Sequence, residues 1–222
     1  MRFDDRIVMV TGAAGNLGRA VGGAFQHLGA TMVLLDMKAE GPIIPTDLRD
    51  PTSVQRAVDR TLERHGRIDV LCNIAGGFRM GPMLHETPQA DWDFLFDLNA
   101  KSILHTARAV VPAMIRNGSG KIVNVGASAA QKGVAAMGAY VASKSAVIRM
   151  TETMAAELRE KNINVNCVLP TIIDTPENRA AMPGADPRRW VAPHDLAAVI
   201  VFLASDAARA VHGAAIPVSG LS

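Results

Sequence analysis

The sequence predicts an α/β fold built on a parallel β-sheet. Short apolar segments alternate with longer helical patterns along the 222 residues, which is typical of parallel strands joined by helical crossovers. A glycine-rich turn over residues 12–18 separates the first apolar segment from the first helical one. No repeat, linker or low-complexity stretch divides the chain, so we expect a single domain over residues 1–222.

The elements follow from these patterns in chain order. Apolar runs such as RIVMV, TMVLLD and DVLCNI read as buried strands, and Pro51 stands at the first turn of a helix, where its missing N–H does no harm. The expected strands cover residues 6–10, 31–36, 43–44, 69–74, 121–126, 163–169 and 214–218. The expected helices run from the glycine turn to about 27, from 51 to about 64, from about 88 to 116 as one helix or two, from about 138 to 161, and from 192 or 193 to 204.

Charge and composition exclude several classes of protein. The net charge is +2, with no basic block and no acidic tail, so we expect neither a nucleic-acid partner nor a membrane-surface partner. The first six residues are too charged for a signal peptide, and no apolar run approaches the ~18 residues of a membrane span. Cys72 and Cys167 both lie in apolar strands, which predicts reduced thiols and a cytoplasmic protein.

The candidate catalytic pair is Tyr140 and Lys144. Four residues separate them, which places both side chains on one face of a helix. A nearby cation lowers the pKa of a phenol, so the pair would exchange a proton near neutral pH. The alternative for an isolated pair of this kind is an ordinary surface helix.

The glycine-rich turn predicts a nucleotide site. Residues 11–18 (TGAAGNLG) follow a strand and open a helix, where glycine lets the backbone approach a pyrophosphate and the helix N-terminus offers free N–H groups. Asp36 ends the second strand and would accept a hydrogen bond from a ribose 2′-hydroxyl, which favours NAD over NADP. Arg19 and Lys38 are close enough in sequence to weaken that preference. A tight turn and a turn-capping Asp are the structural alternatives.

The glycine loop, residues 73–76 (NIAG) and Tyr140-x-x-x-Lys144 occur in the order found in the short-chain dehydrogenase/reductase family, which the chain resembles from residue 6 to 220. Asp47, Asn99, and Pro170 followed by Thr175 are further matches. The resemblance implies a seven-stranded parallel sheet in the order 3-2-1-4-5-6-7 flanked by helices. It also implies an NAD(P)-dependent oxidoreductase that acts on a small carbonyl or alcohol, and a homodimer or homotetramer. In that order one strand, or about 10 Å, separates the two cysteines, too far for a disulfide.

The resemblance also implies roles for particular residues. Tyr140 would exchange a proton with the substrate oxygen, Lys144 would hold the nicotinamide ribose and lower the pKa of the tyrosine, and Asn99 would hold a water linking Lys144 to solvent. Asn99 could instead be a helix-surface amide, and Thr175, expected at the carboxamide, a turn hydroxyl. The implied cofactor contacts are Gly12, Gly15, Asn16, Leu17, Gly18 (pyrophosphate loop), Asp36, Asp47, Leu48 (adenosine), Asn73, Ala75, Gly76 (ribose), Tyr140, Lys144, Pro170 and Thr175.

Two positions depart from the family pattern. Asn16 stands where a glycine is usual, and we expect the phosphate site to survive because Asn tolerates positive φ better than most residues. Ala127 stands 13 residues before Tyr140, where the family usually has a serine that hydrogen-bonds the substrate oxygen. The neighbouring Ser128 is a catalytic candidate only if the chain has left the strand or bulges there, because adjacent strand residues point to opposite faces.

Residues 75–78 (AGGF), 126–130 (GASAA), 174–179 (DTPENR) and 182–186 (MPGAD) resemble the dihydropteridine reductase branch of the family. That branch uses NADH, reduces a quinonoid C=N system and manages without the usual serine. Only 17 residues separate Thr175 from Pro193, so the substrate-covering segment, about 176–192, is short and suits an open pocket or a planar ligand.

Phe78, Met137 and Trp190 are candidates to line the substrate pocket, with anchoring of the covering segment as the alternative for Trp190. The histidines show no metal-ligand spacing, so we expect no metal site. Apolar residues on more than one face of the helices over 99–111 and 141–154 predict a subunit interface. A dinucleotide-binding sensor without catalysis remains as another class of function.

Overall fold

A computed structural model of the chain describes residues 1–38 and 40–222. Within those residues one sheet of seven parallel strands has the order β3-β2-β1-β4-β5-β6-β7. The strands are β1 (Ile7–Thr11), β2 (Thr31–Asp36), β3 (Ile44–Pro45), β4 (Val70–Asn73), β5 (Gly120–Val125), β6 (Ile163–Pro170) and β7 (Ala215–Val218). This order confirms the doubly wound α/β fold that the sequence predicts.

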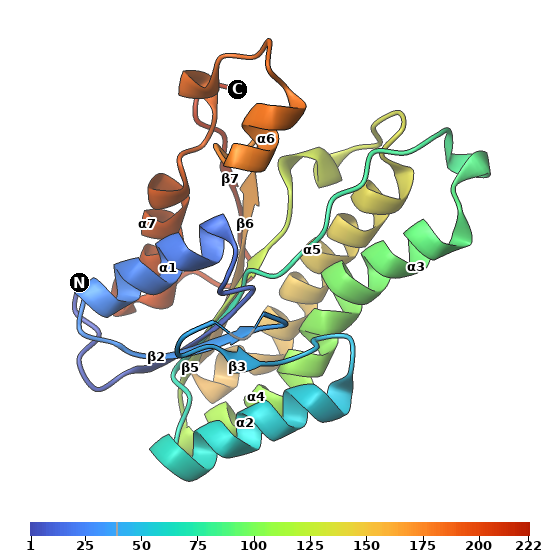
Figure 1. Cartoon of the computed structure of the whole chain (residues 1–222). Helices are drawn as coiled ribbons and strands as arrows, with labels where there is room; N and C mark the ends of the chain where they lie inside the picture. The colour runs from blue at the N-terminus through green and yellow to red at the C-terminus, as the bar shows by residue number, and fades with distance from the viewer. Residues whose placement is uncertain (39) are drawn as a thin grey trace.

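Helices cover both faces of the sheet, with α1 and α7 side by side on one face and α2, α4 and α5 on the other (Figure 1). The α-helices are α1 (Asn16–His27), α2 (Pro51–His65), α3 (Gln89–Phe96), α4 (Ser102–Asn117), α5 (Gly138–Leu158), α6 (Pro176–Ala181) and α7 (Pro193–Ala204). Short 3-10 turns cover Leu84–Glu86, Ser128–Gln131, Arg159–Lys161, Pro187–Arg189 and Asp206–Ala208.

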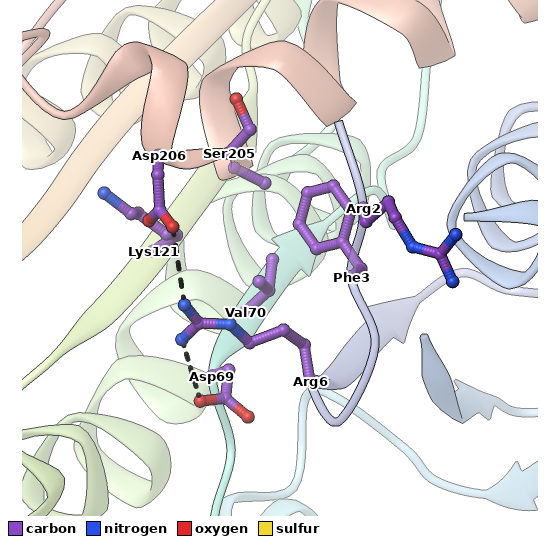
Figure 2. A pocket seen from close by; sticks show the side chains of 9 residues that line it. Arg2, Phe3, Arg6, Asp69, Val70, Lys121, Ser205 and Asp206 are labelled. Atoms are coloured by element: carbon purple, nitrogen blue, oxygen red, sulfur yellow. Dashed lines mark hydrogen bonds and ion pairs between the residues drawn. The ribbon is translucent and has the colours of Figure 1, made fainter. Parts of the chain in front are cut away.

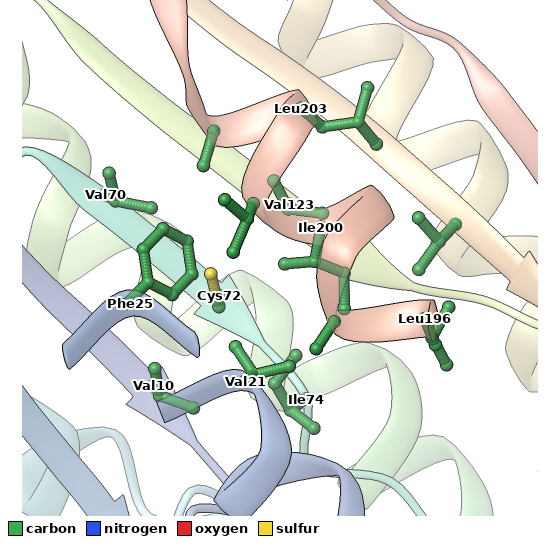
Figure 3. Packing of buried hydrophobic residues seen from close by; sticks show 14 of the residues in the cluster. Val10, Val21, Phe25, Val70, Cys72, Ile74, Val123, Leu196, Ile200 and Leu203 are labelled. Carbon is green, nitrogen blue, oxygen red and sulfur yellow. The ribbon is translucent and has the colours of Figure 1, made fainter. Parts of the chain in front are cut away.

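The core consists of two main layers, one on each face of the sheet. Val8 and Val10 of β1 point toward α1 and α7, while Ile7 and Met9 point to the opposite face. A parallel strand buried on both faces needs apolar residues at consecutive positions, which is why β1 reads as an unbroken apolar run. Figure 3 shows the first layer, in which side chains of α1 and α7 meet those of β1, β4 and β5.

The helical region predicted over residues 88–116 is continuous. Helix α3 passes through a π-helical turn, Asp97–Lys101, directly into α4. π-turns of this kind are rare and frequently lie at functional sites. This one carries Asn99 at the edge of the sheet where the predicted site residues gather.

The first helix begins earlier than the sequence pattern indicates. Helix α1 starts at Asn16, inside the glycine-rich segment, and its N-cap is Gly15. Gly12 has φ +66°, a conformation that favours glycine, and it makes the turn out of β1. Asn16 is helical, so the positive φ that we expected it to tolerate is not required of it.

Both cysteines are free and buried, Cys72 in β4 and Cys167 in β6, with β5 between them. This arrangement confirms the expected absence of a bond between them. Among the residues that the structure describes, no helix is both long and apolar enough to cross a membrane.

Candidate active site

Tyr140 and Lys144 project from the N-terminal half of α5 toward the carboxyl ends of β5 and β6. Lys144 is only 5% exposed, and its Nζ donates a hydrogen bond to the carbonyl oxygen of Val125, the last residue of β5, at 2.8 Å. Tyr140 packs against a buried cluster that includes Ala127. The Phe78 ring meets the Tyr140 ring edge-on, with the centroids 4.9 Å apart. The helix therefore presents a phenol and an ammonium side by side at the expected edge of the sheet.

Burial sets the protonation behaviour of this pair. It raises the pKa of Tyr140 to about 12 and lowers the pKa of Lys144 to about 8. The expectation that a nearby cation lowers the pKa of the tyrosine is wrong for the protein without cofactor. The Lys144 ammonium is directed to the Val125 carbonyl, and loss of water disfavours both the phenolate and the ammonium.

The lowered pKa of Lys144 predicts a measurable effect of pH on stability. The ordinary lysine value is 10.5, so between about pH 8 and that value the unfolded chain binds more protons than the folded one. The free energy of unfolding therefore rises with pH across this window, by about 1–2 kcal/mol between about pH 8 and pH 9.5. The gain should be absent from Lys144→Met, as measured by urea unfolding of both proteins at each pH. Parallel pH profiles would contradict the assignment.

Asn99 ties the active-site helix to the loop after β4. Its Oδ1 accepts a hydrogen bond from the Gly77 N–H at 2.8 Å, and its Nδ2 donates to the Gly77 carbonyl and to Ser143 Oγ at 3.1 and 2.9 Å. Ser143 Oγ in turn donates to the Tyr140 carbonyl at 2.8 Å. Asn99 is therefore a buried positioning residue and not the surface amide of the alternative interpretation. Contact with water would have to use its backbone.

Ser128 lies beyond the end of β5, which stops at Val125. It starts the 3-10 turn Ser128–Gln131, so the condition for Ser128 to act in place of the usual serine is met. The Ala127 side chain is buried in the cluster against which Tyr140 packs, whereas Ser128 is partly exposed. Gln131 Nε2 donates to Ser128 Oγ at 3.5 Å, which leaves that hydroxyl able to donate elsewhere.

The glycine loop is packed too closely for side chains at two of its positions. A Cβ on Gly12 would lie 2.8 Å from the backbone of Ala75, and a Cβ on Gly18 would lie 2.1 Å from the Gly12 carbonyl oxygen. Neither position has room for a side chain. The N-terminus of α1 has no described side-chain cap and no acidic residue in its first turn, so its N–H groups are available to an anion. Gly15, Asn16, Leu17 and Gly18 surround this helix end, which fits a pyrophosphate.

Two carboxylates that the sequence assigns to the adenosine end of the cofactor have partners within the protein. Asp36 Oδ2 accepts a hydrogen bond from the Ala14 N–H at 3.0 Å, so this residue shapes the loop. Asp47 pairs with Arg49 through both carboxylate oxygens, and this hydrogen-bonded pair lowers the pKa of Asp47. Both acids are therefore anchored by their neighbours before any ligand arrives.

Four other predicted cofactor residues have structural roles that restrict how they could touch a ligand. Asn73 is buried, donates to Asn124 Oδ1 at 2.8 Å and accepts from Thr106 Oγ1 at 3.0 Å. The Leu48 side chain lies in the core, and its carbonyl oxygen is 2.9 Å from His105 Nδ1. Thr175 caps α6 through the Asn178 N–H, and Pro170 is the buried last residue of β6. Asn73 and Leu48 could reach a ligand only through their backbone.

Exposed apolar side chains lie close to Tyr140, where the sequence predicts the substrate pocket. Phe78 is 57% exposed beside Tyr140, and the following residues include the exposed Met80, Met83 and Leu84. Met137 lines a pocket that contains both apolar and charged residues, namely Arg79, Gly81, Pro82, Thr87, Asp91, Leu95, Ala136, Gly138 and Ala139. Trp190, by contrast, has a buried side chain, 7% exposed, and its backbone lies against Gly220 near the C-terminus, which favours the anchoring alternative.

The covering segment reaches the cofactor loop. Asn16 Nδ2 donates a hydrogen bond to Glu177 Oε2 of α6 at 2.9 Å. The residue that replaces a usual glycine thus joins the loop to the cover.

A second pocket lies at the opposite edge of the sheet, where Arg6, Asp69 and Lys121 precede or begin the strands β1, β4 and β5. Figure 2 shows Arg6 between Asp69 and Asp206, within 3.4 and 3.5 Å of their carboxylates. Asp69 also accepts hydrogen bonds from the Ile7 N–H and from Arg67. This pocket is an ion-pair network that holds strand ends together, far from Tyr140.

Sequence reasoning missed three polar residues that shape the site. Ser143 and Thr11 hold backbone at the edge of the sheet, Thr11 Oγ1 by accepting from the N–H groups of Ile74 and Ala75. Asn124 lies opposite Asn73 in the β4–β5 register and donates to Thr151 Oγ1. The sequence signal that could have identified Asn124 is its position in an apolar strand, which matches the position of Asn73 in the neighbouring strand.

Comparisons with known proteins agree with this geometry. A family model described as short chain dehydrogenase matches residues 6–185. The 3-oxoacyl-acyl-carrier-protein reductase FabG of Thermotoga maritima is 33% identical over 99% of this chain and 98% of its own. The D-threitol dehydrogenase of Mycolicibacterium smegmatis is also 33% identical, over 99% of this chain and 93% of its own.

Solved structures show the same likeness. The crystal structure of NAD+-bound xylitol dehydrogenase has a TM-score of 0.89 at 28% identity, covering 99% of this chain and 100% of that one. A short-chain type dehydrogenase/reductase from Mycobacterium ulcerans has a TM-score of 0.93 at 27% identity, covering 100% of this chain and 90% of that one. On this evidence the chain belongs to the short-chain dehydrogenase/reductase family, whose members are oxidoreductases that use NAD(P).

Proposed function

We propose that the protein is an NAD(H)-dependent oxidoreductase that moves a hydride to or from a small carbonyl or alcohol substrate, with Tyr140 as general acid/base. The observation that carries the proposal is the position of the Tyr140 hydroxyl and the buried Lys144 on one turn of α5, at the sheet edge that also holds the glycine loop. Asn99 and Ser143 hold the loop after β4 against this turn of α5, which supports a site whose catalytic residues are held in place.

In this proposal the nicotinamide, when bound, supplies or accepts the hydride. Tyr140 gives a proton to the substrate oxygen in reduction and takes one in oxidation. Lys144 stays close to the phenol and, as an ammonium, would favour the phenolate. The Phe78 ring, which lies edge-on against the Tyr140 ring, would shield one side of the phenol from water. Ser128 is the candidate hydrogen-bond donor to that oxygen.

The preference for NAD follows from Asp36, whose carboxylate faces the loop and would repel a 2′-phosphate. The measurement is kcat/KM for NADH and NADPH with the same carbonyl substrate. We expect NADH to be the better cofactor, and a higher kcat/KM with NADPH would reject this part of the proposal.

A dihydropteridine reductase-like activity is the second candidate. The observation that favours it is Ala127, which leaves no hydroxyl at the usual serine position, since reduction of a C=N bond has no ketone oxygen to polarise. NADH oxidation should be compared for quinonoid dihydropterin and a panel of small ketones, with the wild type and Ser128→Ala.

The two candidates predict different outcomes of that comparison. If Ser128 polarises a ketone, its loss lowers ketone turnover by about 10²–10³-fold, the range for loss of one donor to a developing oxyanion. Pterin reduction that is faster than ketone reduction and indifferent to Ser128→Ala would favour the dihydropteridine reductase-like activity.

We further propose a homodimer or homotetramer built on α4 and α5. Leu104 and Ile115 of α4 are 39% and 42% exposed, and a partner packed on α4 and α5 would cover both apolar side chains. Light scattering at micromolar concentration should therefore give a mass at least twice that of the chain. A monomer would contradict the proposal.

A further inference from the structure

Four hydrogen bonds converge around Ala14, on the adenosine side of the glycine loop. The Ala14 N–H donates to Asp36 Oδ2 at 3.0 Å, and the Lys38 N–H donates to Asp36 Oδ1 at 3.1 Å. The Ala14 carbonyl oxygen accepts from Arg19 Nε at 2.9 Å, and the same guanidinium donates through its second nitrogen to Glu40 Oε2 at 2.8 Å. A cation and two carboxylates thus share one patch of the loop.

The position of Arg19 bears directly on which dinucleotide binds. An arginine near the ribose is the group that accommodates the 2′-phosphate of NADP, through paired N–H···O contacts. Arg19 is close enough to Asp36 to play this part, because it is hydrogen-bonded to the carbonyl oxygen of Ala14, whose N–H is hydrogen-bonded to Asp36. In this structure, however, its guanidinium fork is divided between the Ala14 carbonyl and Glu40.

We infer that Glu40 is a cofactor-specificity residue that masks Arg19: its carboxylate pairs with the guanidinium and keeps it from binding the 2′-phosphate of NADP. The Asp36 charge repels the same phosphate. The inference rests on the proposed binding of NAD(H) at the glycine loop. To bind Arg19, a 2′-phosphate would have to displace the Glu40 carboxylate and would be repelled by its charge. A 2′-hydroxyl does not need Arg19 and carries no charge, so Glu40 does not oppose it.

The strength of the ion pair sets the size of the effect. The Arg19 and Glu40 side chains are 62% and 54% exposed, and exposed pairs of this kind are weak. Removal of the Glu40 charge should therefore strengthen NADPH binding by only about two- to fivefold. Because neither side chain is part of the core, substitution of both leaves the fold in place.

The test is a double-mutant cycle on cofactor binding, read from the fluorescence of bound NADH and NADPH and independent of turnover. Glu40→Gln should lower the Kd for NADPH about two- to fivefold and change the Kd for NADH less than about twofold. Arg19→Gln alone should change the Kd for NADPH less than about twofold, since the arginine is already masked. In the Glu40→Gln background the same substitution should return the Kd for NADPH to the wild-type value.

Matched controls separate masking from general charge effects. Asp59→Asn removes an exposed carboxylate of α2 that is hydrogen-bonded to Gln55, and it should leave both Kd values unchanged. Lys38→Gln in the Glu40→Gln background should keep the gain if Arg19 is the phosphate ligand. Adenosine 2′,5′-bisphosphate and AMP, which lack the nicotinamide, should show the same pattern as NADPH and NADH.

The outcomes that overturn the inference are distinct from those that overturn the proposed function. Equal effects of Arg19→Gln in both backgrounds, or a gain from Glu40→Gln no larger than that from Asp59→Asn, would show that Glu40 masks nothing. A wild type that binds NADPH as tightly as NADH would also overturn it. A wild type that binds neither dinucleotide would instead reject the proposed function.

Discussion

Tyr140→Phe should lower kcat by about 10²–10⁴-fold and leave the Kd for NADH within about twofold of the wild-type value, because general acid/base groups contribute rate enhancements of this size. The substitution removes only the hydroxyl. The ring that packs edge-on against Phe78 and on the buried cluster around Ala127 is retained, so the fold and the apolar surface stay the same. The measurement is steady-state turnover, with NADH binding measured separately by fluorescence.

An unchanged kcat would reject Tyr140 as the proton donor. A small loss limited to pterin substrates would favour the dihydropteridine reductase-like alternative, in which a C=N bond depends less on the hydroxyl. Phe78→Leu is a useful control, because it alters the contact with the tyrosine ring without touching the proton. It should change KM for the substrate more than kcat.

Tyr140 is the only tyrosine of the chain, so ultraviolet absorbance reports its ionisation directly. Burial raises its pKa to about 12, above the usual value of 10.0. In the cofactor-free protein we therefore expect almost no phenolate at about pH 10, where an unfolded chain is half ionised. The unfolded sample is the control. If Tyr140 ionised near pH 10 in both the folded and the unfolded sample, its burial would be contradicted.

The sequence predicted the fold because local pattern and topology coincide in this chain. Consecutive apolar residues in β1 and β4 can only be buried on both faces of a parallel sheet, and the Gly12 turn marks the first crossover. The strand order came from the family resemblance. The boundary that differed, the start of α1 at Asn16, depends on the contact of Gly18 with the Gly12 carbonyl, which no local pattern reveals.

The candidate site was predictable as a set of residues but not as a set of orientations. The spacing of Tyr140 and Lys144 was sufficient to place them together. The direction of their pKa shifts was not, because it depends on how much water the surrounding core removes. Asn73 shows the same limit. Its side-chain amide is hydrogen-bonded to Asn124 and Thr106, so it is not free to bind a ligand. Residue identity indicates what chemistry is possible, while tertiary packing decides which atoms are free to do it.

Gly18→Ala should be the most damaging single-methyl substitution near the cofactor loop. Its Cβ would lie 2.1 Å from the Gly12 carbonyl oxygen and 2.8 Å from the Ala13 Cα. Both neighbours are backbone, so relief requires the turn itself to move away from the N-terminus of α1. Overpacking of this kind costs about 1–3 kcal/mol, and we expect the upper part of that range. Because the same turn positions the N–H groups for the pyrophosphate, NADH binding should weaken more than about tenfold.

Gly23→Ala provides the matched control, since it is the same substitution in the same helix. Gly23 is exposed, and a Cβ there would meet nothing within 4 Å. Alanine in a helix interior is favoured over glycine, so this variant should be more stable by about 0.5–1 kcal/mol with the Kd for NADH unchanged. Chemical unfolding and NADH titration of the two variants then separate helix propensity from loop geometry. Similar behaviour of both would mean that the close approach of Gly18 to Gly12 does not shape the cofactor site.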